Sequence, residues 1–147
     1  MPLLSRLFFA LGALSAALWV GLSAAAAHVP ALQQGGPALA ASLQQHQLHA
    51  VGLLLVGLML ARRASAWLVA AGVLMLAGLL LFCLNIDARI LWGWDAARAL
   101  VPAGGSAFIL AWLAFAVGAW RQSARSRTPT GSADLNPPAV PASAPPT

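Results

Sequence analysis

The chain has 147 residues, of which 61% are hydrophobic and only 7% charged. Soluble globular domains are about 45–50% apolar and about 25% charged, so this composition excludes an ordinary water-soluble domain and favours a single integral membrane domain. The net charge of +5 comes from eight basic and three acidic residues. The basic residues are all arginines, and they flank apolar stretches as topology signals do. We therefore expect the lipid bilayer as a partner, and no nucleic acid.

The first apolar segment is predicted to span the membrane over residues 5–27. Its uncharged part after Arg6 is long enough to cross a hydrocarbon core of about 30 Å. Small residues recur in it at every fourth position and should form a face on which a neighbouring helix packs closely: Ala13, Ala17, Gly21 and Ala25. An alternative remains open, because the alanines before His28 also resemble the cleavage site of a secretory signal.

A polar connection leads into the second apolar segment. Gly36-Pro37 favours a helix start, because proline at the first helical position loses no N–H bond that the helix needs. This helix is expected to cross the bilayer over residues 44–61, with His46 and His49 at or just inside the interface.

Two further spans are predicted over residues 67–86 and 100–120. The connection 62–65 is short, so the second and third spans should form an antiparallel hairpin. Tryptophans fall at the predicted water boundaries, as in aromatic belts: Trp67, Trp92, Trp94 and Trp120. The pattern predicts an all-α, integral membrane four-helix bundle within residues 1–121.

The arginines predict the orientation of this bundle. With both termini in the cytoplasm, six arginines would lie inside: Arg6, Arg62, Arg63, Arg121, Arg125 and Arg127. Only Arg89 and Arg98 would lie outside, balanced by Asp87 and Asp95. This positive-inside bias predicts a multi-pass protein of the bacterial inner membrane with both termini cytoplasmic.

Residues 122–147 are rich in Pro, Ala and Ser and have no hydrophobic periodicity. Such a segment cannot bury enough apolar surface to offset the entropy lost on ordering. We predict a disordered cytoplasmic tail.

The three histidines, His28, His46 and His49, are all expected at the outer end of the first two helices. His46 and His49 are three residues apart and share a helix face, and three imidazoles would suit zinc or copper. The chain contains no Glu, and its nearest Asp and Cys belong to another helix. The metal motif is thus incomplete, so we expect no cofactor, with zinc or copper at these histidines as the alternative.

The remaining residues with ionisable or reactive side chains are not expected to take part in binding or catalysis. Asp87 and Asp95 lie at a predicted span boundary and are expected to be solvated loop charges, which leaves the spans without a buried acidic group for a proton relay. Cys83 is expected to fill apolar space.

The last span contains the motif Pro-x-Gly-Gly-x-x-Phe-x-x-x-Trp in full, as Pro102, Gly104, Gly105, Phe108 and Trp112. His49 matches the end of a Tyr-Gln-x-x-His stretch, and residues 22–28 keep the histidine and small residues of a Leu-Gly-Ala-Phe-Gly-Ala-His stretch. By these motifs residues 5–121 resemble the YgdD-like small inner-membrane proteins, a family of unknown function. The family's Gly-Ser-Leu-Tyr stretch is missing around residues 83–87. The resemblance implies about four transmembrane helices and a first helix that is retained. Pro102 and the glycine pair could break the last helix as in transporters, but proline in a first turn and paired glycines more often permit helix entry and close packing, which is the role we expect for this motif.

The function that we expect from these patterns is structural. The sequence contains no nucleophile–base pair, phosphate-binding loop or complete metal motif, so we expect a non-enzymatic protein that works through membrane partners or by forming a homo-oligomer. Two alternatives remain: a membrane protein that binds a metal or small molecule with its outer-face histidines, and an exported protein with a cleaved first segment.

Overall fold

The computed structural model describes residues 3–126, and this part of the chain is helical apart from short turns. In chain order the elements are α1 (Leu3–His28), α2 (Pro30–Gln33), α3 (Gly36–Arg62), α4 (Ala66–Gly78), the π-helix η1 (Leu79–Leu84), α5 (Asn85–Trp92), the 3₁₀-helix η2 (Arg98–Leu100) and α6 (Val101–Ser126). Because α4, η1 and α5 follow one another without a break, they form one long helix. The predicted all-α fold with four long helices is confirmed.

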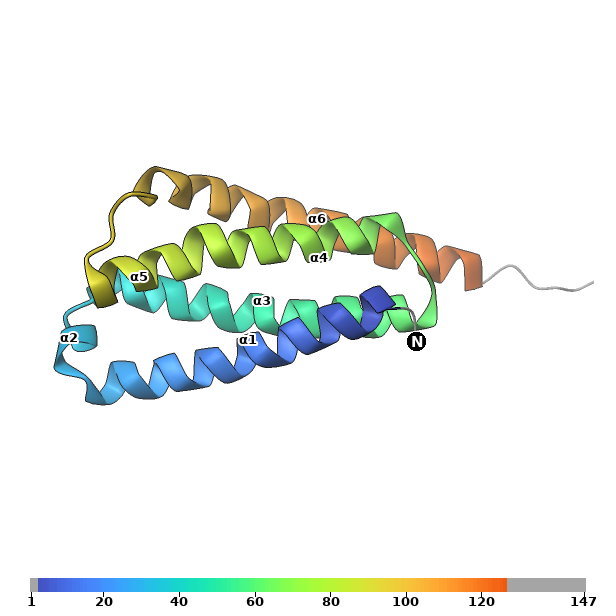
Figure 1. Cartoon of the computed structure of the whole chain (residues 1–147). Coiled ribbons are helices and arrows are strands. Elements are labelled where there is room, and N and C mark those ends of the chain that lie inside the picture. Colours follow the sequence, from blue (N-terminus) through green and yellow to red (C-terminus); the bar gives the residue numbers. More distant parts are fainter. Residues whose placement is uncertain (1–2, 127–147) are drawn as a thin grey trace, which may run out of the picture.

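The four long helices lie side by side, and each runs antiparallel to the one before it (Figure 1). The start of α1, the α3–α4 connection and the end of α6 lie at one end of the bundle, and α2 and the α5–α6 connection lie at the other. α1 packs chiefly on α3, whereas α3 also touches α4, η1, α5 and α6. Side chains on the inner face of α3 can therefore reach every other long helix.

Local sequence explains where the helices begin and end. α3 begins at Gly36, which has a positive φ of 56°, and Pro37 occupies its first turn, as predicted. α5 ends at Gly93, where a φ of 68° gives the left-handed cap that glycine adopts without steric cost. The third long helix continues past the predicted boundary at 86 to Trp92, and α6 continues past 121 to Ser126. The rest of the predicted tail lies outside the described residues.

Three helical stretches of the described chain are long and apolar enough to cross a membrane: Leu3–His28, Ala66–Trp92 and Arg98–Ala124. α3 is just as long, at 27 residues, but is not among them. Serine, glutamine and histidine in its first half lower its hydropathy. Three of these polar side chains, at Ser42, His46 and His49, are buried inside the bundle.

α1 and α3 approach closely, but not through the predicted face of α1. A Cβ added to Gly12 would lie 2.9 Å from the backbone N of Leu54, and one added to Gly57 would lie 2.8 Å from the backbone N of Phe9. Within residues 3–126 no helix packs closely on the predicted small-residue face: Ala13, Ala17 and Gly21 are exposed, Ala25 is half-buried, and an added Cβ on Gly21 would meet nothing within 4 Å. Spacing alone showed that these residues share a face, but not which face α3 would cover.

The buried apolar core lies mainly between α3, the α4–η1 stretch and α6. It comprises Phe8, Leu53, Val56, Leu60, Leu68, Ala71, Met75, Leu79, Cys83, Phe108, Ala111 and Ala114. Phe8 is the only member from α1. α1 therefore contributes little to this core.

Candidate functional site

Three polar side chains of α3 form a buried row: Ser42, His46 and His49. Spacings of four and three residues put them on one face of the helix, and each is 2% exposed or less. Because α3 touches all the other long helices, each side chain of this row bonds to a different one.

His49 is bonded on both sides of its ring. Trp112 Nε1–H of α6 donates to His49 Nε2 over 3.0 Å, so the ring carries its proton on Nδ1 and donates it to the Gln45 carbonyl over 2.7 Å. The ring of Phe108 stacks on the imidazole, with centroids 3.5 Å apart and planes inclined by 17°. These contacts use both nitrogens and one face of the ring, so His49 acts as a packing residue.

His46, one turn earlier, is bonded on one side only. Its Nε2 and Ser15 Oγ of α1 share a hydrogen bond of 2.9 Å. Its Nδ1 is buried and has no partner within residues 3–126. A buried polar atom without a partner costs about 1–3 kcal/mol, which makes it a candidate for binding something that is not part of this chain.

Asp87 of α5 shows the same feature. Ser42 Oγ–H donates to Asp87 Oδ1 over 2.7 Å, while Oδ2 is buried without a partner among the described residues. The Cys83 thiol donates to the Ser42 carbonyl over 3.4 Å. Cys83 belongs to the π-helix η1, a kind of distortion that occurs often at functional sites.

The polar row lies toward the end of the bundle that carries α2. At 1.5 Å per residue, His46 lies about 24 Å along α3 from Arg62, and Asp87 lies about 30 Å along the α4–α5 helix from Trp67. A hydrocarbon core is about 30 Å thick. If Arg62 and Trp67 mark one boundary of the core, Asp87 lies at the other boundary and His46 lies just inside it.

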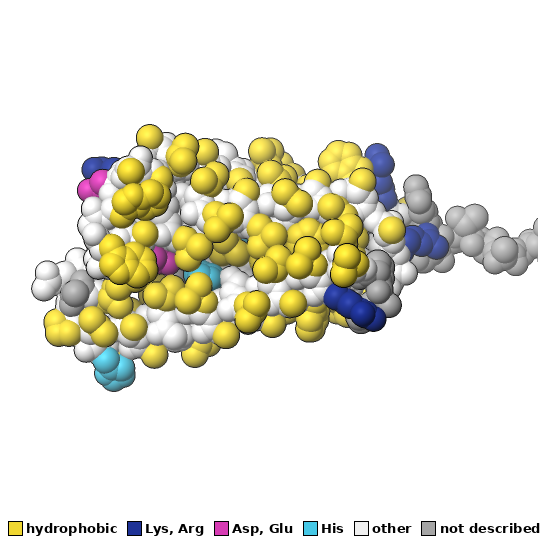
Figure 2. All heavy atoms as spheres, viewed as in Figure 1, with side chains coloured by type: hydrophobic (Ala, Val, Ile, Leu, Met, Phe, Trp, Pro, Cys, Tyr) yellow, Lys and Arg dark blue, Asp and Glu magenta, His cyan; other side chains and the backbone are white. Residues whose placement is uncertain are grey.

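A lateral groove runs between α1 and the α4–α5 helix, and we call it the α1–α5 groove. Its outer part, of about 560 Å³, is lined by Asp87, Asn85, Trp92 and Trp94 together with leucines. Its inner part, of about 400 Å³, is lined by His46, Ser15 and leucines. The two parts share Leu18, Leu80 and Leu84 and so adjoin. Figure 2 shows hydrophobic walls on this side of the molecule, with acidic and histidine side chains visible between them.

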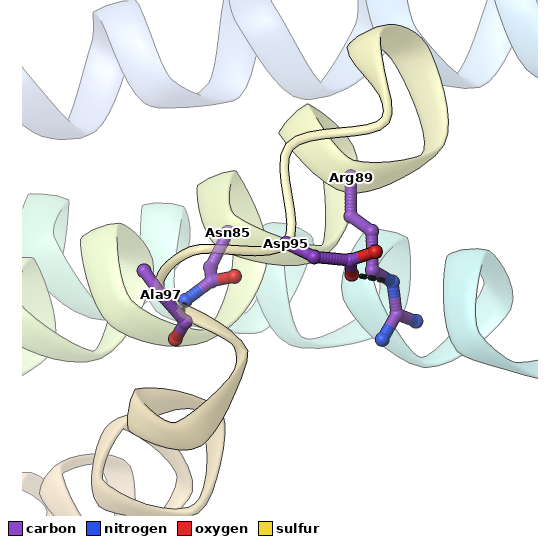
Figure 3. A network of polar contacts seen from close by, with 4 residues as sticks. All are labelled: Asn85, Arg89, Asp95 and Ala97. Carbon is purple, nitrogen blue, oxygen red and sulfur yellow. Dashed lines mark hydrogen bonds and ion pairs between the residues drawn. The ribbon is translucent and has the colours of Figure 1, made fainter.

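The α5–α6 connection forms the outer end of this groove. Asn85 Nδ2–H donates to the Ala97 carbonyl over 2.6 Å, and Arg89 pairs with Asp95 over 4.0 Å (Figure 3). Both contacts join α5 to the loop that follows it and so hold Trp94 and Ala97 against the groove. Arg89 is thereby engaged with Asp95.

The structure does not bring together the three histidines of the alternative metal site. His28 is exposed at the last turn of α1, and within residues 3–126 no three side chains of the His, Cys, Asp and Glu types are grouped to hold a metal ion. His46 and His49 share a helix face but bond to α1 and α6 respectively. Spacing within one helix could not reveal this divergence, because it depends on the neighbouring helices.

The prediction for Asp87 was wrong, since the side chain is buried beside Ser42 and is not a solvated loop charge. The helix extends beyond the predicted boundary at 86 to Trp92, which encloses Asp87 in the bundle. Asp95, by contrast, is exposed as expected. The sequence did contain a signal for Asp87: it lies four residues after Cys83, on the same helix face as that buried residue.

Residues of the last-span motif contact the polar row of α3 at His49. Phe108 and Trp112 hold His49, and a Cβ on Gly104 would lie 2.7 Å from the backbone N of Phe82. Gly105 has no such contact, because the nearest atom to an added Cβ would be 3.9 Å away. Pro102 lies in the first turn of α6, which is continuous.

Comparison with known proteins places the chain in a family. Residues 22–105 match the family described as "Protein of unknown function (DUF423)". The chain is also 33% identical over 120 residues to the "UPF0382 membrane protein YwdK" of Bacillus subtilis (strain 168), covering 78% of this chain and 96% of that protein. No solved structure matches. The chain belongs to the DUF423 family and is a helical membrane protein, and the matched range contains the polar row and Asp87.

Proposed function

We propose that this member of the DUF423 family is a non-enzymatic binding protein of the bacterial inner membrane. It takes an apolar molecule with a hydrogen-bonding head group from the bilayer into the α1–α5 groove. The observation that carries the proposal is the pair of unpartnered polar atoms, His46 Nδ1 and Asp87 Oδ2, on residues that line this groove.

Two physical arguments support binding at this place. Ionisable groups within a membrane are costly and are kept mainly where they bind or relay something. Pockets for small molecules are largely apolar, have volumes of about 300–1,000 Å³, and carry a few polar groups that orient the ligand. The groove has this composition, with leucine walls and polar groups toward its outer end.

The buried serine, cysteine and histidine side chains favour a binding function over catalysis and over metal binding. Ser42 and Cys83 line neither part of the groove, so neither would meet a substrate carbonyl bound there. Both nitrogens of His49 are engaged, which leaves the outer-face histidines without a ligand set for zinc or copper. Elemental analysis of the purified protein checks this part of the proposal, and stoichiometric zinc or copper lost in His46→Leu would overturn it.

The proposal places both termini in the cytoplasm. Arg6, Arg62, Arg63 and Arg121 belong to helix ends at the same end of the bundle, whereas Arg89 pairs with Asp95 at the other end. This distribution supports the positive-inside orientation. The close α1–α3 packing supports a retained first helix, and the motif around Gly104 and Trp112 supports kinship with the YgdD-like proteins within the family.

A photoactivatable long-chain alcohol tests the binding function. Dodecanol with a diazirine near the end of its chain would be irradiated with the protein in nanodiscs of zwitterionic lipid, and labelled residues would be mapped by mass spectrometry. We expect labelling of Leu76 and Leu79 on the inner groove wall, competed by unlabelled dodecanol. Leu110 and Leu113 on the outer face of α6 provide the internal control, because they are exposed and line no such groove.

The same experiment in His46→Leu should lower groove labelling roughly fivefold, because the head group loses a partner. The control positions should be labelled as before. Groove labelling that does not saturate, or that equals labelling at Leu110, would mean that bulk lipid fills the groove and would contradict the proposal.

A second candidate function is that of an interaction protein, for which the exposed small-residue face of α1 is the specific observation. Two copies with the same topology present parallel α1 helices, the arrangement in which small residues four apart let helices approach closely. The expected partner is therefore a second copy. Ala17→Leu should convert a dimer into a monomer by light scattering in mild detergent, whereas Val20→Leu, at an exposed neighbouring position, should not. A monomeric parent protein would exclude this candidate.

A further inference from the structure

We infer that the head group that the α1–α5 groove accepts is a protonated amine, so that the ligand is a cationic amphiphile. This inference rests on the proposed binding function and names its ligand class.

Asp87 has no basic partner among the described residues. Its Oδ1 accepts from the Ser42 hydroxyl, and its Oδ2 accepts from no donor within residues 3–126. The closest basic residue in sequence, Arg89, is paired with Asp95 in the loop. A carboxylate that is 3% exposed and lacks a countercharge is costly to bury. A ligand cation would supply that countercharge.

An ammonium group matches the unpartnered atoms better than a hydroxyl does. It has three N–H donors, whereas an alcohol has one O–H. In the His46 tautomer whose Nε2–H donates to Ser15 Oγ, the Nδ1 atom is an acceptor, and with Asp87 Oδ2 it then gives two acceptors without hydrogens. An ammonium group therefore carries enough donors for Asp87 Oδ2 and for a further acceptor. Its bond to the carboxylate is charge-assisted and roughly twice as strong as a neutral hydrogen bond.

The groove also fits the rest of an amphiphile. Asp87 lies in the outer part, beside the tryptophans that mark the membrane boundary, and the inner part continues along leucines toward Leu11 and Leu76. A chain with its amine at Asp87 would thus extend toward the middle of the bilayer. Trp92 and Trp94 also line the outer part, and aromatic rings attract cations.

Competition between matched ligands tests the inference. Dodecylamine, dodecanol and dodecanoate would each compete with the diazirine-bearing alcohol for groove labelling in nanodiscs of zwitterionic lipid. We expect dodecylamine to compete at about tenfold lower concentration than dodecanol, and dodecanoate to compete least, because of the charge-assisted bond.

Two substitutions assign this preference to one carboxylate. Asp87→Asn keeps an acceptor for Ser42 but removes the charge, so the amine and the alcohol should then compete equally. Asp95→Asn removes a carboxylate from the exposed loop outside the groove, and the amine preference should persist. This matched control separates a specific contact from general attraction of cations to an acidic end of the protein.

The outcomes separate the two proposals. If no ligand gives saturable competition, the binding function itself fails. If dodecanol competes as well as dodecylamine, or if the amine preference survives Asp87→Asn, binding stands and the cationic head group is wrong. A preference that disappears in both Asp87→Asn and Asp95→Asn would also contradict the assignment to Asp87.

Discussion

His46 and His49 are one turn apart on the same face of α3, and both are buried, yet their surroundings differ. His49 lies between α3 and α6, with both nitrogens bonded and Phe108 stacked on its ring. His46 faces α1, with one nitrogen bonded to Ser15 and the other without a partner in the described chain. Each side chain also lines a pocket, of about 300 Å³ beside His49 and about 400 Å³ beside His46, so the two residues differ in the nitrogen that stays without a partner within residues 3–126.

This difference distinguishes a packing residue from a binding residue. Both side chains lose hydrogen bonds to water on burial, but only His49 replaces them at both ring nitrogens with bonds inside the protein. An atom left unpaired next to an open groove can recover the cost by binding a ligand. Burial by itself therefore says little about the function of a polar residue, whereas its remaining hydrogen-bonding capacity says more.

The largest expected effect concerns the side of the bundle where His49 meets α6. Substitutions at two adjacent glycines of α6 should have opposite effects on stability there. Gly104→Leu should lower the free energy of unfolding by about 3 kcal/mol, because the new side chain would collide with the backbone of Phe82. Gly105→Leu should be neutral or slightly stabilising, since its position is open and leucine favours helix. Unfolding by SDS titration in mixed micelles measures both. Equal losses would show that the α6–η1 contact is less close than described.

The two histidines offer the next comparison. His49→Leu should destabilise the protein by about 2 kcal/mol, because it leaves the Trp112 N–H buried without its acceptor and disturbs the stack with Phe108. His46→Leu should leave stability unchanged or raise it slightly, because it removes an unpaired buried nitrogen while Ser15 can bond to its own helix. The same titration, without added ligand, compares the two. A larger loss of stability for His46→Leu than for His49→Leu would contradict the assignment of His49 as the packing residue and His46 as the binding residue.

The smallest expected effect isolates one hydrogen bond. Trp112→Phe keeps an aromatic ring next to Phe115 but removes the donor to His49, and should cost about 1 kcal/mol, in the range of hydrogen bonds within membrane proteins. In the His49→Leu background the same substitution should cost much less, because the acceptor is already gone. Additive losses in the double variant would show that the two side chains do not interact.

Much of the fold follows from local sequence. Composition and uninterrupted apolar length predict membrane helices, and Gly36-Pro37 marks the start of α3 because proline suits a first turn. The short connection after Arg62 predicts the hairpin of α3 and α4. These features depend on a few neighbouring residues, so reading them requires no knowledge of the packing.

Tertiary packing alone decided which faces meet and which polar groups find partners. Small residues recur along α1, yet α3 packs on Gly12 and leaves Ala17 and Gly21 exposed. His46 and His49 look equivalent in sequence, and Asp87 resembles a loop charge. Their partners come from residues 31, 63 and 45 positions away in the chain, at Ser15, Trp112 and Ser42 respectively. Hydrogen bonds over such separations depend on how whole helices are rotated against one another, which helical periodicity within one segment cannot specify.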